Sequence, residues 1–287
     1  MYECIRAAGN TYYIDCPSRM GLYLTDSEAI AIDSGGDKDA AKKLLRHTGE
    51  RRLSAVYHTH SHADHIGGSA LLRERTGCAV FAPAIECAFT RYPILEPLGL
   101  YGGRPPKALH HKFLLATPVE ATPLAAMPDG WESIPLPGHS PAMTGYRTPD
   151  DVVFLGDCLA SEATLEKYPV GYLYDVGQYL ETLERVKSLS AALFVSAHAP
   201  ALEDVTPLVQ RNAQTVLEIC DTVEALCAEP IGFDGLLAAL CERYGIALNA
   251  LQHALVGSTL RSYLSYLCDS GRLQTDFEGN LCRWYRA

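Results

Sequence analysis

Four histidines and an aspartate lie within the segment YHTHSHADHIGG, residues 57–68. His60 and His62 are separated by one residue, so an extended backbone projects both side chains to the same side. Asp64 and His65 follow as neighbours, which a turn can aim at a nearby point. Imidazole and carboxylate groups together are ligands for zinc, iron or manganese. The segment is therefore typical of a metal site.

Three further candidate ligands each follow a short apolar run later in the chain. His139 lies in WESIPLPGHS, Asp157 in DVVFLGDCLAS and His198 in AALFVSAHAP. Each run is typical of a short strand, and layered α/β folds bind ligands at strand ends and in the loops that follow them. We therefore expect these three residues to join the first cluster in one metal centre.

The order of these motifs resembles a known family. THSHADHIGG resembles the HxHxDH signature of the metallo-β-lactamase superfamily, and PLPGHS, FLGDCL and SAHAP resemble its later metal-binding motifs. The resemblance spans residues 11–200, and chance would have to supply seven matching residues. It implies an αββα sandwich of two mixed sheets flanked by helices, with the metals at one edge. It also implies one metal on His60, His62 and His139, a second metal on Asp64, His65 and His198, and Asp157 bridging the two.

The implied cofactors are two divalent metal ions, for which zinc is the first expectation and iron or manganese the alternatives. Two such ions can share a water and lower its pKa, so that a metal-bridging hydroxide becomes the nucleophile. Asp64 and Asp157 are then the candidate catalytic residues. Asp157 would hold the metal spacing, and Asp64 would be a ligand that can also orient the hydroxide.

Two positions narrow the choice within the superfamily. True metallo-β-lactamases generally lack the aspartate found here at Asp157, and flavodiiron oxidoreductases usually carry a glutamate where His62 stands. The sequence most resembles the glyoxalase II-like hydrolases, which cleave thioesters and other acyl bonds. We therefore expect a hydrolase acting on a small acyl substrate. A mononuclear iron persulfide dioxygenase and a noncatalytic metal-binding protein are weaker alternatives.

The elements that must position these residues can be predicted from the surrounding sequence. Apolar runs such as TYYID and RLSAVYHTH alternate with helical segments such as DKDAAKKLLRHTG, in which Asp37 can cap the helix and Gly49 can end it. Strands that alternate with helices indicate an α/β layered architecture. We expect residues 1–204 to form the catalytic domain. Within it, residues 89–130 are rich in Pro and Gly, which predicts either a lid or a surface insertion.

Residues 205–287 change to helix-rich sequence. Three segments with helical apolar spacing precede GRLQTDFEGNLCRWYRA, which is typical of two strands joined by a turn at EGN. This order predicts a small winged-helix-like module. A similar module follows the catalytic domain in lactamase-like single-strand endoribonucleases, so RNA cleavage by the same metal pair is the alternative function.

The charge of this module bears on that alternative. From residue 206 onward six basic residues face nine acidic ones, although four arginines cluster near the predicted wing, namely Arg261, Arg272, Arg283 and Arg286. Nucleic-acid binding requires basic side chains gathered on one face, so nucleic acid is the weaker partner. We expect instead that the module packs on the catalytic domain, where it would wall the substrate pocket, or on a second subunit in a homodimer.

Composition limits the remaining classes of protein. The 287 residues are 48% hydrophobic and carry a net charge of −10, which allows a large core and disfavours nonspecific binding to nucleic acid. No apolar run reaches the ~20 residues of a membrane span. The N-terminus lacks the order of a signal peptide, and the ten cysteines form no CxxC pair. We therefore expect a cytoplasmic protein without a membrane partner.

Several residues beside the motifs have less specific predictions. Asp33 is expected to order the loops beneath the metals, and Cys158 to point away from them into the core. Tyr172 and Tyr174 each fit either the pocket lining or core packing. His58 is expected to lie outside the set of ligands.

Overall fold

The first of two large sheets contains seven strands that follow one another in chain order. The structure is a computed structural model that describes residues 2–287. The first four strands pair antiparallel, and β4 to β7 pair parallel. The strands are β1 (Glu3–Ala8), β2 (Thr11–Asp15), β3 (Met20–Leu24), β4 (Glu28–Ile32), β5 (Arg52–Tyr57), β6 (Ala79–Ala82) and β7 (Thr122–Pro123). Because β5 lies between parallel neighbours, the loop after it leaves at the carboxyl edge of the sheet.

The second sheet has four strands in the order β11-β10-β9-β8. These are β8 (Glu132–Pro135), β9 (Thr144–Arg147), β10 (Val152–Ala160) and β11 (Leu193–His198). Large side chains of both sheets, including Tyr57, Tyr146 and Phe154, are buried together in one cluster. This cluster forms the inner core between the two sheets.

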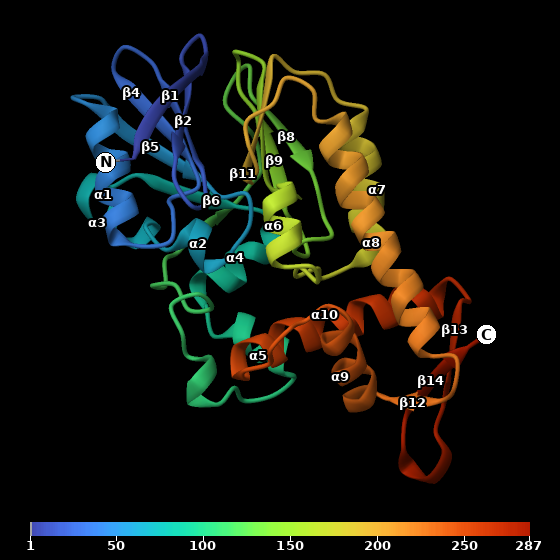
Figure 1. Ribbon diagram of the computed structural model, residues 1–287. Helices are drawn as coiled ribbons and strands as arrows, with labels where there is room; N and C mark the ends of the chain where they lie inside the picture. The colour runs from blue at the N-terminus through green and yellow to red at the C-terminus, as the bar shows by residue number, and fades with distance from the viewer. Residues whose placement is uncertain (1) are drawn as a thin grey trace.

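Helices cover the outer face of each sheet, so the layers run helix, sheet, sheet, helix (Figure 1). The first sheet is covered by α1 (Lys38–Thr48) and α3 (Ser69–Thr76), and the second by α7 (Val176–Lys187) and α8 (Thr206–Leu226). The predicted start and end of α1 are confirmed: the Asp37 side chain accepts from two backbone N–H groups, and Gly49 follows the last helical residue. The expected αββα sandwich is confirmed.

Residues 89–130 contain more regular structure than the sequence predicts. They include the end of α4 (Ala84–Arg91), α5 (Leu95–Tyr101) and a 3₁₀ turn at Lys107–Leu109. The Pro and Gly of EPLGLYGG do not prevent α5, because proline is tolerated in a first turn and Gly102 takes the left-handed conformation that ends the helix. Leu100, Leu109 and Leu114 pack against Ala254 of α10. This segment therefore contacts the C-terminal region.

The C-terminal region contains the helices and the hairpin that the sequence predicts. Its elements after α8 are β12 (Ile231–Gly232), α9 (Phe233–Arg243), α10 (Ala250–Asp269), β13 (Leu273–Asp276), a 3₁₀ turn at Glu278–Asn280 and β14 (Arg283–Arg286). β13 pairs antiparallel with β14, which also pairs with β12. One buried apolar cluster continues from β10 through α7 and α8 into α9 and α10. The C-terminal helices thus share a core with the second sheet.

Two further observations concern the described residues as a whole. Within the described residues, no helix combines the length and apolar character that a membrane crossing requires. All ten cysteines are free thiols.

Candidate metal centre

The loop after β5 carries four of the predicted ligands. It passes through His60 and His62 and then forms the one-turn helix α2 (Ala63–Ile66), which holds Asp64 and His65. The backbone at His62 is still extended, so the chain turns only after the second histidine. This change from extended to helical backbone aims two pairs of side chains at one region.

The other three predicted residues reach the same region from the second sheet. His139 lies in the loop between β8 and β9, and His198 is the last residue of β11. Asp157 does not end its strand as expected, because β10 continues to Ala160. Instead, the ladder with β11 is irregular beside Gly156, which has a φ of 54°. A Cβ at Gly156 would lie 3.0 Å from Thr59, so this position favours glycine on two counts.

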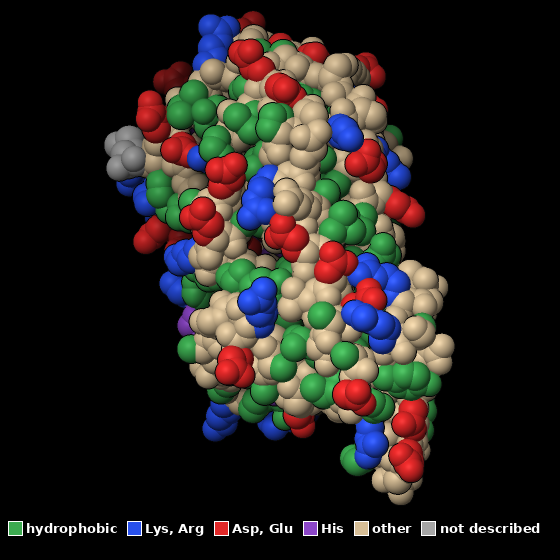
Figure 2. Space-filling view, turned by 45° about the vertical axis from the view of Figure 1, so that its right-hand side comes forward, with side chains coloured by type: hydrophobic (Ala, Val, Ile, Leu, Met, Phe, Trp, Pro, Cys, Tyr) green, Lys and Arg blue, Asp and Glu red, His purple; other side chains and the backbone are tan. Residues whose placement is uncertain are grey.

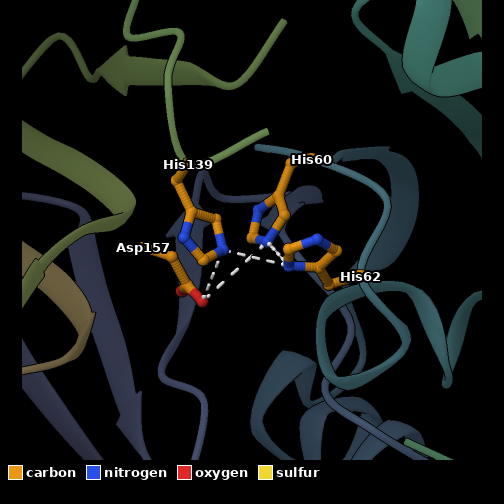
Figure 3. Close-up of side chains that lie close together, drawn as sticks. All are labelled: His60, His62, His139 and Asp157. Carbon is orange, nitrogen blue, oxygen red and sulfur yellow. Dashed lines mark hydrogen bonds and ion pairs between the residues drawn. The ribbon is translucent and has the colours of Figure 1, made fainter. Parts of the chain in front are cut away.

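A first group comprises three imidazoles and one carboxylate (Figure 3). The His62 Nδ1 atom lies 3.0 Å from His60 Nε2 and 3.0 Å from His139 Nε2. The Oδ2 atom of Asp157 lies 3.4 Å from His139 Nε2. Three ring nitrogens and a carboxylate oxygen therefore converge on one small volume.

A second group comprises Asp64, His65, Asp157 and His198. The Nε2 atom of His198 lies 3.2 Å from Asp64 Oδ2 and 3.3 Å from Asp157 Oδ2. The Nε2 atom of His65 lies 2.9 Å from Asp157 Oδ1. Asp157 belongs to both groups, so the structure brings all seven predicted residues together.

The chemistry of the first group fits a divalent cation. Burial lowers the pKa of His60 and His62, and it lowers the pKa of His139 to about 3. Neutral imidazoles have a free lone pair on one ring nitrogen, and a metal ion requires that form of histidine. Three such rings, with the Asp157 carboxylate beside them, face one shared volume.

The second group gives independent evidence that the site fits a divalent cation. His65 Nε2 and Asp157 Oδ1 are buried, and neither has a hydrogen-bond partner. They approach each other without the alignment of a hydrogen bond. Buried polar atoms without partners are rare in proteins. A cation between them would satisfy both atoms, so this donor set also fits a metal ion.

Asp33 holds the loop from below, as predicted. Its carboxylate accepts from His65 Nδ1 at 2.8 Å, from the Thr59 hydroxyl at 2.8 Å and from the Thr59 backbone N–H at 2.9 Å. A proton on His65 Nδ1 leaves Nε2 as the nitrogen that faces the cluster. Asp33 thereby sets the tautomer and the orientation of that ring.

Glu86 is a residue that the sequence analysis missed. It lies on α4, is completely buried, and accepts from the hydroxyls of Ser61 and Ser140 and from the backbone N–H groups of Ser61 and Ala142. These contacts join the loop of His62 to the loop of His139. The only signal in the sequence is an acidic residue within an apolar helix, which does not reveal its partners.

The residues with less specific predictions lie in different places relative to the site. The Tyr172 ring lies 5.4 Å from the His62 ring and 5.8 Å from the His139 ring, between ring centroids, so Tyr172 lines the site. Tyr174 is half exposed, and Cys158 is buried in the apolar core as predicted. His58 is buried against Asp33 and Ser69, outside both groups.

Comparison with known proteins identifies the family. Residues 9–198 match the family described as the Metallo-beta-lactamase superfamily. The match covers well over half of the sequence, so the chain belongs to the metallo-β-lactamase superfamily. Proteins of this family bind divalent metals, which agrees with the chemistry of both groups.

Individual relatives resemble the chain over part of its length. A hydroxyacylglutathione hydrolase of Albidiferax ferrireducens is 31% identical over 141 residues, which cover 47% of this chain and 45% of that protein. The probable metallo-hydrolase YqgX of Bacillus subtilis is 27% identical over 190 residues, which cover 64% of this chain and 85% of the relative. The chain thus spans less than half of the first relative.

Solved structures share the fold over nearly the full length. A β-lactamase domain protein from Burkholderia ambifaria gives a TM-score of 0.73 at 18% identity and covers 99% of this chain and 94% of its own. A metallo-β-lactamase family protein from Thermus thermophilus gives 0.72 at 19% identity, with 97% and 99% covered. These likenesses concern the fold, and they include the C-terminal region.

Proposed function

We propose that this metallo-β-lactamase superfamily hydrolase uses two divalent metal ions to cleave a thioester or ester bond of a small acyl substrate. The observation that carries the proposal is the pair of side-chain groups that share Asp157. The relatives named hydroxyacylglutathione hydrolase support an acyl substrate, since that name describes an acyl thioester.

Under this proposal the predicted ligands divide between the two ions. The first ion would be held by His60, His62 and His139, the second by Asp64, His65 and His198, and Asp157 would contact both. Zinc suits this set of imidazoles and carboxylates best, with iron or manganese as alternatives. When bound, the two ions would lower the pKa of a water molecule and supply a hydroxide nucleophile at neutral pH.

The remaining chemistry belongs to the protein's own side chains. Asp157 fixes the separation of the two groups because it is common to both. The Asp64 carboxylate accepts from the Ser18 hydroxyl at 2.5 Å, which holds it at the edge of the second group. From there Asp64 can orient the attacking water. Burial keeps Tyr172 protonated by raising its pKa, so its hydroxyl can donate to the substrate.

The C-terminal region supports a role as part of the substrate site. We infer that its helix, strand, two helices and hairpin form a winged-helix-like module, with residues 1–204 as the catalytic domain. Residues 89–130 pack against α10 of this module, where they can act as a lid over the centre. The module then serves as a wall of the site.

The arginines of the module weaken the endoribonuclease alternative. Arg272 pairs with Asp221 and Glu224, and Arg286 also pairs with Glu224. Arg283 lies 3.7 Å from Glu278. Basic and acidic side chains are mixed over the face in Figure 2, including around the C-terminal hairpin. A phosphate backbone would be attracted most by unpaired basic side chains on one face.

The proposal is tested with one preparation of the full chain, reconstituted with zinc. We would measure hydrolysis of an acyl-thioester panel and of a labelled single-stranded RNA, together with the bound metal. Thioester cleavage with two zinc ions per chain is the expected result. RNA cleavage without thioester cleavage would overturn the proposed substrate class.

Asp157→Ala is the variant that tests the shared carboxylate. It should abolish thioester hydrolysis and reduce the bound zinc, because Asp157 is common to both groups. Asp26→Ala is the matched control, since Asp26 is exposed in the turn between β3 and β4. Near-normal turnover by Asp157→Ala would contradict the dinuclear mechanism.

A further inference from the structure

A cavity of about 290 Å³ opens beside the candidate metal centre. His139, Asp157 and His198 line one end of it. Its other walls are largely apolar and come from two parts of the chain. Leu165 and Val170 belong to the catalytic half, Val216 and Ile219 to α8, and Leu255 and Val256 to α10.

Several polar side chains in these walls already have partners in the protein. Both amide atoms of Asn212 bond to the backbone of Ala160, at 2.9 and 3.1 Å. The Tyr179 hydroxyl donates to the carbonyl of Cys158, and the Thr215 hydroxyl donates to the carbonyl of Arg211. These groups therefore offer little to a polar ligand, and most of the remaining lining is apolar.

A second cavity, of about 250 Å³, has a different character. Tyr172 lines both cavities, and His62 lines the second. Glu96, Arg261 and several serines make up much of the second lining. The candidate metal centre thus has an apolar cavity and a polar cavity that meet at Tyr172.

We propose that the apolar cavity binds the acyl chain of the substrate, so that α8 and α10 set the length of chain the enzyme accepts. The inference rests on the proposed hydrolase function and names its substrate more closely. An apolar chain is stabilised by leaving water for an apolar wall. The second cavity is lined by the charged residues Glu96 and Arg261, which suit a polar group better, so the leaving group would lie on that side of Tyr172.

The size of the cavity sets the expected chain length. Its volume lies just below the ~300–1,000 Å³ typical of small-molecule sites, which favours a short or medium chain. Each buried methylene should raise kcat/KM by roughly fourfold until the cavity is full. Longer chains should then give no further increase.

The test uses the zinc-loaded full chain and a series of N-acetylcysteamine thioesters from acetyl to decanoyl. Thr215→Phe narrows the cavity from α8, at a partly exposed position. Gln214→Phe is the matched control, because Gln214 is exposed on the same helix and does not line the cavity. Thr215→Phe should lower the ratio of octanoyl to acetyl kcat/KM by more than tenfold. The control should keep the full dependence on chain length.

A second variant and a binding measurement keep the test decisive. Leu255→Ala enlarges the cavity and should shift the preference toward longer chains, whether or not Thr215→Phe folds. Octanoate binding, measured by calorimetry, should weaken in Thr215→Phe and stay unchanged in Gln214→Phe.

The outcomes separate the two proposals. Hydrolysis of every thioester without dependence on chain length would overturn the acyl-chain site and leave the hydrolase function in place. Failure to cleave any thioester would overturn the proposed function. In that case octanoate binding that depends on Thr215 would still support the apolar cavity as an acyl site, and binding that ignores Thr215 would overturn it.

Discussion

The candidate metal centre and the wall opposite it are built on different principles. The metal-binding side chains come from loops at strand ends, and buried carboxylates such as Asp33 and Glu86 hold those loops. The wall comes from the helices α8 and α10, whose apolar side chains contribute shape and volume rather than polar contacts. The metal centre depends on the positions of specific atoms, whereas the wall depends on the volume of its side chains. Substitutions on the two sides should therefore differ in both size and kind of effect.

Removal of the wall is expected to have the largest effect, which is a loss of folding stability. A chain that ends at Ala201 loses α8, α9 and α10, whose buried side chains pack against β10 and α7. Each exposed large apolar side chain costs ~1.5–3 kcal/mol, and the total exceeds the ~5–15 kcal/mol by which proteins are stable. We expect little folded protein, measured by soluble yield and circular dichroism. A truncated chain that melts cooperatively at the full-length Tm would show that the two sides are independent.

Replacement of Glu86 should have an intermediate effect on the metal side. Glu86→Gln keeps the size of the side chain but places an amide N–H against groups that already donate. We expect a ~10–100-fold loss of zinc affinity, as is typical when a group behind the metal ligands is replaced. Zinc titration would measure it, with the exposed Glu74→Gln as the control. Unchanged affinity would show that the two loops hold their positions without Glu86.

Replacement of Glu96, which lines the polar cavity, should have the smallest effect, a small change in thermal stability. Burial and the nearby Asp64 and Glu86 carboxylates raise the pKa of Glu96 well above its usual value. When folding raises the pKa of a carboxyl group, the folded protein loses stability as the pH rises above that group's unfolded pKa of ~4.3. Glu96→Gln should therefore raise the Tm of the metal-free protein by a few degrees near pH ~7 and leave it unchanged near pH ~4. Thermal unfolding at both pH values measures the change in Tm. An equal change in Tm at the two pH values would show that the charge of Glu96 is not the cause.

The ligand motifs and much of the local structure could be predicted from the sequence alone. The spacing of His60, His62, Asp64 and His65 is local, and a short stretch of backbone already sets how these side chains can point. The cap at Asp37 and the hairpin of β13 and β14 follow from interactions between near neighbours in the chain. Such features depend on few residues, so a sequence pattern can predict them.

Partners that lie far apart in the chain are visible only in the tertiary structure. Glu86 reaches Ser140 across 54 positions, and no periodicity in either segment indicates that contact. The helix α5 forms despite its Pro and Gly, with Leu100 packed against α10. The apolar cavity likewise exists only where α8 and α10 meet the second sheet. Burial and packing set these features, and both depend on the whole chain rather than on any local segment.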